Sequence, residues 1–511
     1  MIGIDMSIIN SIVSWVMKQR IHQIGLFLKY PHEVQMEWFK KLIPMAENTV
    51  IGKKYDFKSI HTYDAFRNRF PVQDYETLKP YIERMKMGEQ NVLWHTEIRW
   101  FAKSSGTTGN KSKFIPMSQE AMEDCHFKGG KDLLSIYCNN NPETMIFSGK
   151  ALTLGGSHQI NIESGNTWFG DLSAIIMENL PAWVEYMRTP ELNIALMGEW
   201  ESKLERIAHQ TIEEDVTNLS GVPSWMLILL QRIMQIRRTD NILDIWPNLE
   251  VFFHGGVSFT PYMEQYRKLI PSGQMHYMET YNASEGFFGI QDQTDSNDLL
   301  LMLDYGIFYE FVPVENADDE NPPVLWLAEV KTNVNYAMLI TTNGGLWRYK
   351  IGDVVQFTST SPYRIKISGR TKHFINAFGE ELIIDNAEKA MAIACEKTGA
   401  IIMEYTAGPV FMDAGGNGAH EWLIEFEKEP AELGHFSDIL DNALKSINSD
   451  YEAKRYKNIT LRPPIIRVME PGTFYEWMKR RDKLGGQNKV PRLANDRKFL
   501  DEILGIKELV K

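Results

Sequence analysis

The stretch "SSGTTGNKSK" (residues 104–113) gathers small hydroxyl and glycine residues with two lysines. Serine, threonine and glycine favour turns, and short apolar runs stand on both sides, so we expect a loop between two strands. The amides and hydroxyls of such a loop can wrap a polyphosphate, and a lysine can neutralise its charge. Either Lys111 or Lys113 can supply that charge, and Lys113 is favoured because it directly precedes the second strand. Taken alone, the same composition also suits a simple hairpin tip.

Two further motifs carry groups that suit a nucleotide. "HGGVSF" follows an apolar run, and its Gly255 and Gly256 would let the backbone approach a flat ring closely. "YNASEG" supplies the aromatic face of Tyr281 and the carboxylate of Glu285, which can hold Mg²⁺ beside phosphate. Singly, a motif of this kind is more often an ordinary turn or solvated surface.

Two polar residues nearer the C-terminus complete the set. Asp353 in "YKIGDVV" can accept hydrogen bonds from both hydroxyls of a ribose, and Arg370 lies in "SGRTKHFINAFGEEL". A lone Gly-Asp is usually a turn, and an arginine at a strand end is usually in a surface ion pair. The order of all these motifs along one chain is the specific signal.

The bulk composition narrows the class of protein. The chain has 511 residues, which is too many for one hydrophobic core, so two or more domains are expected. The net charge of −13 argues against general nucleic-acid binding, which needs a basic face. Cys125, Cys138 and Cys395 form no CxxC pair, which predicts reduced thiols in a cytoplasmic protein without a disulfide framework or a zinc site.

The N-terminal segment is apolar but interrupted. It lacks the basic front and small-residue cleavage site of a signal peptide, and Asp5, Asn10 and Ser14 break a run too short to span a bilayer. We expect Ile8 to Met17 to form an amphipathic helix that packs on the body of the protein, with no stable membrane insertion. Peripheral membrane contact is the alternative.

The spacing of apolar residues changes twice along the chain. Residues 1 to about 95 have helical spacing, and short apolar runs with turns follow, including a strand-rich block over 299–368 with a hairpin at Asn343–Gly345. From residue 369 strands and helices alternate, which predicts a separate α+β domain. We therefore expect a mixed α/β fold with a large N-terminal domain (1–370), its sheets flanked by helices, and a small C-terminal domain (371–511).

In this order the motifs resemble those of the adenylate-forming superfamily. Within it, the sequence is most similar to the auxin-responsive acyl-acid amido synthetases of plants and their bacterial relatives. The resemblance rests on "NTVIGKKYDF", "SSGTTGNKSKFIPMS", "SGVPSW", "YNASEGFFGIQ", "FYEFVP", "LWRYKIGDVV" and "QNKVPR", which run from residue 48 to 492. One departure is "GNKSK", where the wider superfamily more often has Gly-x-Pro-Lys.

The resemblance implies a two-step reaction. A carboxylic acid attacks the α-phosphate of ATP, pyrophosphate leaves, and an amine then takes the acyl group from the acyl-adenylate. Ser104, Ser105, Gly106, Thr107, Thr108, Gly109 and Lys113 would hold the β- and γ-phosphates, and Glu285 would hold Mg²⁺. The adenosine would lie on Gly255, Gly256, Tyr281, Asn282, Ser284 and Asp353. Arg370 would stand at the hinge of a mobile C-terminal domain that delivers Lys489 to the reacting atoms.

Three readings of function remain open at this point. The first is an acyl-acid amido synthetase acting on a carboxylic acid and an amine such as an amino acid. The second is a ligase that uses coenzyme A as acceptor after the same first step, and the third is a nucleotide-binding sensor without turnover. The acyl pocket is expected between Ser220–Trp225 and the Gly255 turn, where Trp225 and Met226 are either lining or core residues.

Overall fold

The computed structural model describes the chain except for residues 1–5, 105–112, 157–166, 257–258, 260–261, 318, 320, 371–373, 376–379, 381, 412–417, 449–450, 453–454, 456–460, 485–488, 495 and 510–511. The described residues divide into two compact units. The first contains Met1–Gly256 and Ile270–Lys366, and the second contains Val257–Leu269, Ile367–Leu484 and Asn488–Lys511.

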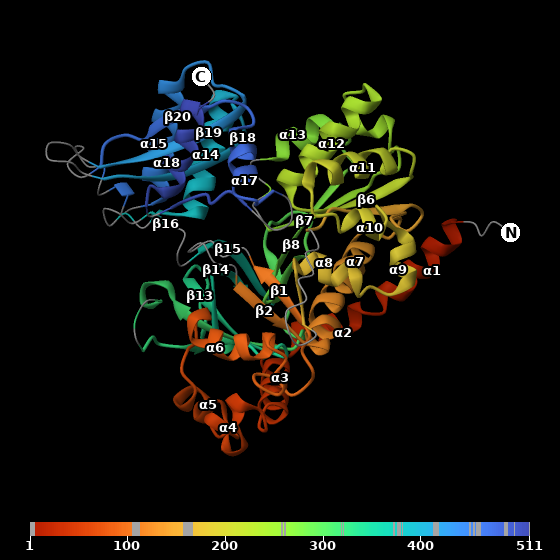
Figure 1. The fold of residues 1–511 in the computed structure, drawn as a ribbon, viewed down its shortest axis with the longest axis vertical. Helices are drawn as coiled ribbons and strands as arrows, with labels where there is room; N and C mark the ends of the chain where they lie inside the picture. The colour runs from red at the N-terminus through yellow and green to blue at the C-terminus, as the bar shows by residue number, and fades with distance from the viewer. Residues whose placement is uncertain are drawn as a thin grey trace. The chain divides into compact units, whose positions relative to one another are not determined.

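The first unit begins with helices, as the spacing predicts (Figure 1). Several begin at a side-chain cap: the hydroxyl of Thr62 accepts from the amide of Ala65, and the carboxylate of Asp74 accepts from that of Thr77. Such caps satisfy the orphan amides of a first turn. The helices are α1 (Met6–Lys18), α2 (Ile21–Lys29), α3 (Pro31–Met45), α4 (Val50–Lys54), α5 (Tyr63–Arg69) and α6 (Tyr75–Lys86).

A twelve-stranded sheet forms the centre of the first unit. Its order is β12-β11-β13-β14-β15-β10-β9-β8-β7-β6-β3-β5, and the run β5-β3-β6-β7-β8 is parallel. The strands are β3 (Lys150–Thr153), β5 (Arg188–Thr189), β6 (Val216–Gly221), β7 (Val251–Gly255), β8 (His276–Ala283), β9 (Gly286–Gln291), β10 (Leu299–Leu301), β11 (Ile307–Pro313), β12 (Leu325–Trp326), β13 (Asn335–Thr342), β14 (Tyr349–Thr360) and β15 (Tyr363–Arg370). β13 and β14 pair antiparallel around the expected turn at Asn343–Gly345.

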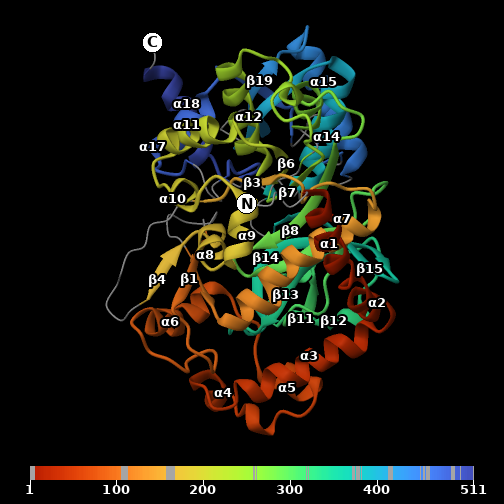
Figure 2. The ribbon, with the colours of Figure 1, turned by 90° about the vertical axis from the view of Figure 1, so that its right-hand side faces the viewer.

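Helices and a small sheet complete this unit. The small sheet has the order β2-β1-β4, made by β1 (Trp100–Ser104), β2 (Lys113–Met117) and β4 (Trp168–Gly170). In Figure 2, α1 and α2 run beside α7 on one side of the unit. The remaining helices are α7 (Lys128–Asn140), α8 (Leu172–Glu178), α9 (Ala182–Met187), α10 (Leu192–Ala195), α11 (Trp200–Thr211) and α12 (Pro223–Arg237).

The second unit is an α+β fold with its own core. Its three-stranded sheet β18-β19-β20 packs against α14, on which Ala387, Ala390, Met391 and Ala394 are all fully buried. α13 belongs to this unit, where the Gln265 amide donates to the carbonyl of Ile402 (3.0 Å). The elements are α13 (Met263–Leu269), β16 (Phe374–Ile375), β17 (Leu382–Ile383), α14 (Ile384–Thr398), β18 (Ile401–Val410), β19 (Ala419–Lys428), α15 (Leu433–Ile447), β20 (Ile465–Met469), α17 (Thr473–Arg480) and α18 (Lys498–Leu509).

The large sheet curls strongly between β8 and β14. Four spacings of about 4.8 Å separate these strands, roughly 19 Å in a flat sheet. Yet the Tyr281 hydroxyl of β8 donates to the Asp353 carboxylate of β14 at 2.6 Å. Two such side chains cannot bridge the flat distance, so the sheet must bend until the two strands face each other.

A buried ion pair fixes the start of β14. The Arg348 guanidinium donates to both carboxylate oxygens of Glu310 on β11 (3.1 and 2.9 Å), and both side chains are almost completely buried. Arg348 also donates to the carbonyls of Arg67 and Phe70, and the Tyr63 hydroxyl donates to Glu310. A buried pair needs this many partners because desolvation is costly.

A buried lysine closes the carboxyl end of β3. The Lys203 ammonium of α11 donates to the carbonyls of Gly155 and Gly156, both at 2.9 Å, and the side chain is 2% exposed. The Ser173 hydroxyl accepts from the Gly156 amide at 2.7 Å. Burial lowers the pKa of Lys203 from 10.5 to about 8, although the nearby charge of Asp171 acts in the opposite direction.

We expect Glu310→Ala to destabilise the first unit by about 3–5 kcal/mol, because it leaves the Arg348 charge buried without its partner. The free energy of unfolding in urea measures this change. Glu315→Ala, at an exposed carboxylate two residues after the end of β11, is the matched control. A loss no larger than that of the control would contradict the assigned role.

We expect the stability of the protein relative to Lys203→Met to rise with pH between about 8 and 10.5. In that window the unfolded chain keeps the lysine proton that the folded chain has released, so raising the pH favours the folded state. The slope is at most about 1.4 kcal/mol per pH unit. Urea unfolding of both proteins across this window measures it. Lys131→Met, at an exposed lysine, should show no such slope.

Candidate active site

The strands on both sides of the predicted phosphate loop are present. β1 ends at Ser104 and β2 begins at Lys113, and these two residues are register partners in an antiparallel pair. Ser105, Gly106, Thr107, Thr108 and Gly109 lie outside the described residues, as does Lys111. Their contact with phosphate, and the choice of Lys113 over Lys111, therefore stay predictions.

Lys113 lies among tyrosines. Its ammonium donates to the Tyr349 hydroxyl at 3.4 Å and stands 5.8 Å from the centre of the Tyr75 ring. The Tyr75 hydroxyl in turn accepts from the amide of Phe114, the residue after Lys113 (2.9 Å). The tyrosines thus hold the start of β2 and its lysine beside the start of β14.

Tyr349 links this lysine electrostatically to Glu285. Burial raises the pKa of Tyr349 well above its ordinary value, and the charge of Glu285 is the next largest cause. Asp353 raises the pKa of Tyr349 as well, so both predicted carboxylates lie within electrostatic reach of one hydroxyl. The structure therefore brings Lys113, Glu285 and Asp353 into one neighbourhood.

Glu285 lies on a tight turn. Ser284 and Glu285 are the two turn residues between β8 and β9. Ser284 is 2% exposed, and within the described part of the chain its hydroxyl has no hydrogen-bond partner. A buried hydroxyl without a partner costs free energy, which a polar ligand or water at this turn would recover. Asn282, two residues before Ser284, is exposed.

Asp353 and Tyr281 form a buried pair. Asp353 is 5% exposed, and one of its carboxylate oxygens accepts from the Tyr281 hydroxyl at 2.6 Å. The Tyr281 ring packs against Phe288 with centroids 4.9 Å apart. The hydrogen bond orients the Asp353 carboxylate.

Different structural constraints favour glycine at the two glycine positions of "HGGVSF". A Cβ on Gly255 would stand 2.5 Å from the carbonyl oxygen of Thr280, so the neighbouring strand β8 excludes any larger residue. Gly256 has φ +82°, in the left-handed region that favours glycine. Burial lowers the pKa of the preceding His254 to about 3, which keeps that imidazole neutral.

Arg370 and Lys489 belong to the second unit. Arg370 ends β15, and its side chain is outside the described atoms. Lys489 is half-buried and lies three residues before Arg492. Arg492 donates to the Tyr262 hydroxyl (2.8 Å) and to the carbonyl of Tyr405 (3.1 Å), so it anchors the chain that carries Lys489.

Tyr349 and Tyr75, the two tyrosines next to Lys113, are not among the residues identified from the sequence. Tyr349 is the first residue of "YKIGD", so its place in that motif could have identified it. Tyr75 begins α6 and has no motif or spacing that separates it from an ordinary core tyrosine. At the expected acyl pocket, Trp225 and Met226 are both buried at the start of α12, which is compatible with either a lining or a core role.

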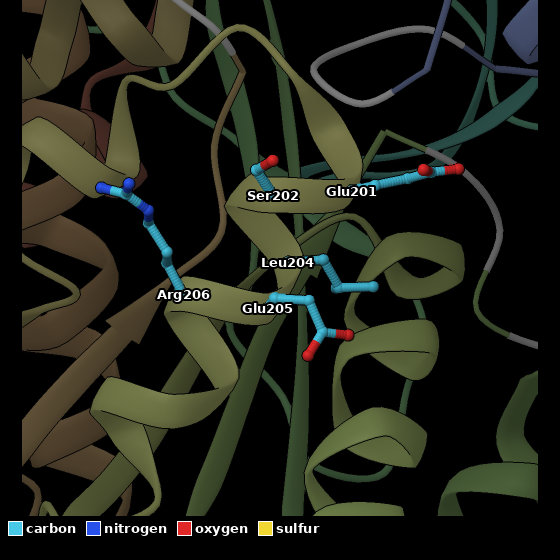
Figure 3. Close-up of a pocket in the computed structure, with 5 residues that line it drawn as sticks. All are labelled: Glu201, Ser202, Leu204, Glu205 and Arg206. Carbon is cyan, nitrogen blue, oxygen red and sulfur yellow. The ribbon is translucent and has the colours of Figure 1, made fainter.

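A pocket of about 580 Å³ lies elsewhere on the first unit. Figure 3 shows that its labelled side chains all project from successive turns of α11. They are Glu201, Ser202, Leu204, Glu205 and Arg206, and none is a predicted site residue. Its lining therefore includes neither Lys113 nor Asp353.

Known proteins resemble the chain along almost its whole length. A curated relative, the indole-3-acetic acid-amido synthetase GH3.3 of Arabidopsis thaliana, is 22% identical over 536 residues that cover 90% of this chain and 89% of the relative. The jasmonoyl–L-amino acid synthetase JAR4 of Nicotiana attenuata is 23% identical and covers 92% of each chain. The solved structure of GH3.15 acyl acid amido synthetase gives a TM-score of 0.78 at 17% identity over 96% of each chain, and this likeness confirms the expected mixed α and β fold.

Family profiles match three consecutive parts of the sequence. The GH3 family N-terminal domain matches residues 20–275, the GH3 family central domain matches 300–370 and the GH3 family C-terminal domain matches 385–498. These matches cover most of the chain in the order N-terminal, central and C-terminal domain, so the chain belongs to the GH3 family.

Proposed function

We propose that this protein is an ATP-dependent acyl-acid amido synthetase. It activates a carboxylic acid as acyl-AMP and transfers the acyl group to an amine, most simply that of an amino acid. The observation that carries the proposal is the joint neighbourhood of Lys113, Glu285 and Asp353 around Tyr349 in a chain of the GH3 family. Relatives across the family, such as GH3.3 and JAR4, are named for amide synthesis between an acid and amino acids.

The chemistry explains why such groups must converge. An acid oxygen attacks the α-phosphorus of ATP, the bond to the bridging oxygen breaks, and pyrophosphate leaves with that electron pair. Two anions must approach for this step, so cations and amide donors near the phosphates lower the barrier. In the second step a neutral amine attacks the acyl carbon, AMP leaves, and one proton is released.

The first unit carries the groups that fit the nucleotide. Asp353 would accept hydrogen bonds from the ribose hydroxyls, and the Tyr281 hydroxyl would orient its carboxylate. Gly255 and Gly256 would border the adenine, and Lys113 would approach the phosphates together with the loop 104–109. Asn282 and Ser284 would contact the nucleotide from the turn after β8, and the buried hydroxyl of Ser284 suits this role.

Glu285 would hold Mg²⁺. Its carboxylate lies in the same electrostatic neighbourhood as Lys113 and Asp353, and an oxygen donor is what Mg²⁺ prefers. A bound Mg²⁺ would neutralise phosphate charge as pyrophosphate separates.

The C-terminal part would supply the remaining charge. We propose that residues 371–511 act as a small mobile domain joined near Arg370, and that Lys489 reaches the α-phosphate and acyl oxygens during adenylation. The anchoring of Arg492 by Tyr262 and Tyr405 supports a fixed orientation for the segment carrying Lys489. A cytoplasmic location, where ATP and free amino acids are abundant, is part of the same proposal.

A panel of acids and acceptors tests the function directly. We expect pyrophosphate release that depends on an acid, and AMP release that depends on both an acid and an amino acid. The product mass should equal that of acid plus amine minus water. Lys489→Ala should lower pyrophosphate release at least about a hundredfold through loss of charge stabilisation, while Lys498→Ala, at an exposed lysine, should leave it unchanged.

The outcomes of this panel separate the alternatives. AMP release with coenzyme A but not with amino acids, and a thioester product, would contradict the amide assignment. ATP binding without pyrophosphate release for any acid would indicate a nucleotide sensor instead. Equal pyrophosphate release by Lys489→Ala and the unmodified protein would remove only the role given to that lysine.

We expect Asp353→Ala to weaken ATP binding by about tenfold to a hundredfold, the effect of losing charge-assisted hydrogen bonds to ribose. Isothermal titration calorimetry measures the change. Tyr281→Phe removes only the hydroxyl that donates to Asp353, so it should weaken binding less. Asp295→Ala, at an exposed aspartate, is the control. An ATP affinity unchanged in Asp353→Ala would refute the ribose assignment.

A further inference from the structure

The inward side of the N-terminal helix α1 carries the polar residues Asn10 and Ser14 together with Met17, and all three are buried. Asn10 is buried, where its amide donates to the carbonyl of Thr144 (2.9 Å) and its oxygen accepts from the amide of Phe147 (3.1 Å). The buried Ser14 hydroxyl lies 3.8 Å from the sulfur of Cys138 on α7. The sequence predicts an amphipathic helix packed on the body. The packing is present, and the buried side of the helix includes polar as well as apolar residues.

The outward side of α1 is apolar. Trp15 is 65% exposed, Ile12 58% and Val16 51%, and spacings of three and four place them on one helical face. Leu26 on α2 and Tyr30 at its C-cap are also exposed, at 58% and 44%. Water solvates such a face poorly, so a cover in the native setting would stabilise it.

More exposed aromatic residues lie close by. α9 lies beside α1 in both views (Figures 1 and 2), and it exposes Trp183 and Tyr186. Most of the large apolar side chains that are exposed in the described part of the chain lie on or near these helices. We call the exposed side chains of α1, α2 and α9 the N-terminal apolar face: Ile12, Trp15, Val16, Leu26, Tyr30, Trp183 and Tyr186.

The charge of the α1–α2 segment is opposite to that of the whole protein. Residues 6–32 contain Lys18, Arg20 and Lys29 and no aspartate or glutamate, in a chain of net charge −13. Arg20 is paired with Asp132 and Asp304, so Lys18 and Lys29 supply the positive charge beside the apolar side chains. The Lys29 ammonium lies 5.1 Å from the Tyr30 ring, and that of Lys150 lies 4.7 Å from the Tyr186 ring. Nearby Glu185 is neutralised by Arg188 at 2.7 Å.

We propose that the N-terminal apolar face docks on an anionic lipid bilayer. Tryptophan and tyrosine favour the boundary between lipid and water, and lysines at the edge of an apolar helical face attract anionic headgroups. A second copy of the chain is the less favourable occupant, because two molecules of net charge −13 repel each other. The docking lies at the surface, since no described helix is both long and apolar enough to cross a bilayer.

Cosedimentation with vesicles tests this docking. The full-length protein is mixed with phosphatidylcholine vesicles that contain phosphatidylglycerol, and separately with vesicles of phosphatidylcholine alone. We expect binding to the anionic vesicles, weaker binding to the neutral ones, and release at high salt. The double variant Ile12→Ser, Trp15→Ser should bind at least about tenfold more weakly, because it removes buried apolar area.

Matched variants separate docking from folding. The double variant Phe411→Ser, Leu433→Ser removes exposed apolar side chains from the second unit and should bind like the unmodified protein. Lys29→Glu should weaken binding to anionic vesicles only. Unfolding midpoints equal to that of the unmodified protein show that each variant is folded.

Three outcomes would overturn the proposal. The first is no binding of the unmodified protein to either kind of vesicle. The second is equal binding to both kinds, which would remove the role of charge. The third is a dimer by light scattering that Ile12→Ser, Trp15→Ser converts to a monomer, which would assign the face to a second copy.

Discussion

The curl of the large sheet is the constraint on which the candidate site depends. Tyr281 and Asp353 belong to strands four places apart in the sheet, and they meet only because the sheet bends until β8 and β14 face each other. At the start of β14, the charge of Glu285 contributes to raising the pKa of Tyr349. Without the curl, the residues that suit phosphate, metal and ribose would lie at separate positions along an open sheet.

Packing beneath β14 keeps this arrangement in place. Arg348 immediately precedes Tyr349, and its buried pair with Glu310 ties β14 to β11 and to the chain between α5 and α6. Tyr75 holds the beginning of β2, where Lys113 lies. Residues of the N-terminal helical segment thus help to position both Lys113 and the start of β14. The first hundred residues therefore have a role in the site, although none of the predicted ligands lies among them.

The two units divide the proposed chemistry. The first carries the groups that suit the nucleotide and the metal, and the second carries Lys489 on a segment held by Arg492. Such a division suits the proposed reaction, because adenylation and acyl transfer need different protein groups near the same acyl carbon. α13 follows the Gly255–Gly256 turn in the chain yet belongs to the second unit, so one continuous segment joins a proposed adenine contact to that unit.

The sequence by itself determined the elements and the motifs. Spacing and composition predicted the helical N-terminal region, the strands around residues 104–113 and the hairpin at Asn343–Gly345, because each depends on residues that are close together in the sequence. Only the tertiary structure decided that Asp353 meets Tyr281 and that Lys113 meets Tyr349, because strand order and sheet curl are set by contacts between distant residues. It also decided which side of α1 faces inward: a helical period shows that two faces exist, but the partners Thr144, Phe147 and Cys138 select the one that carries Asn10 and Ser14.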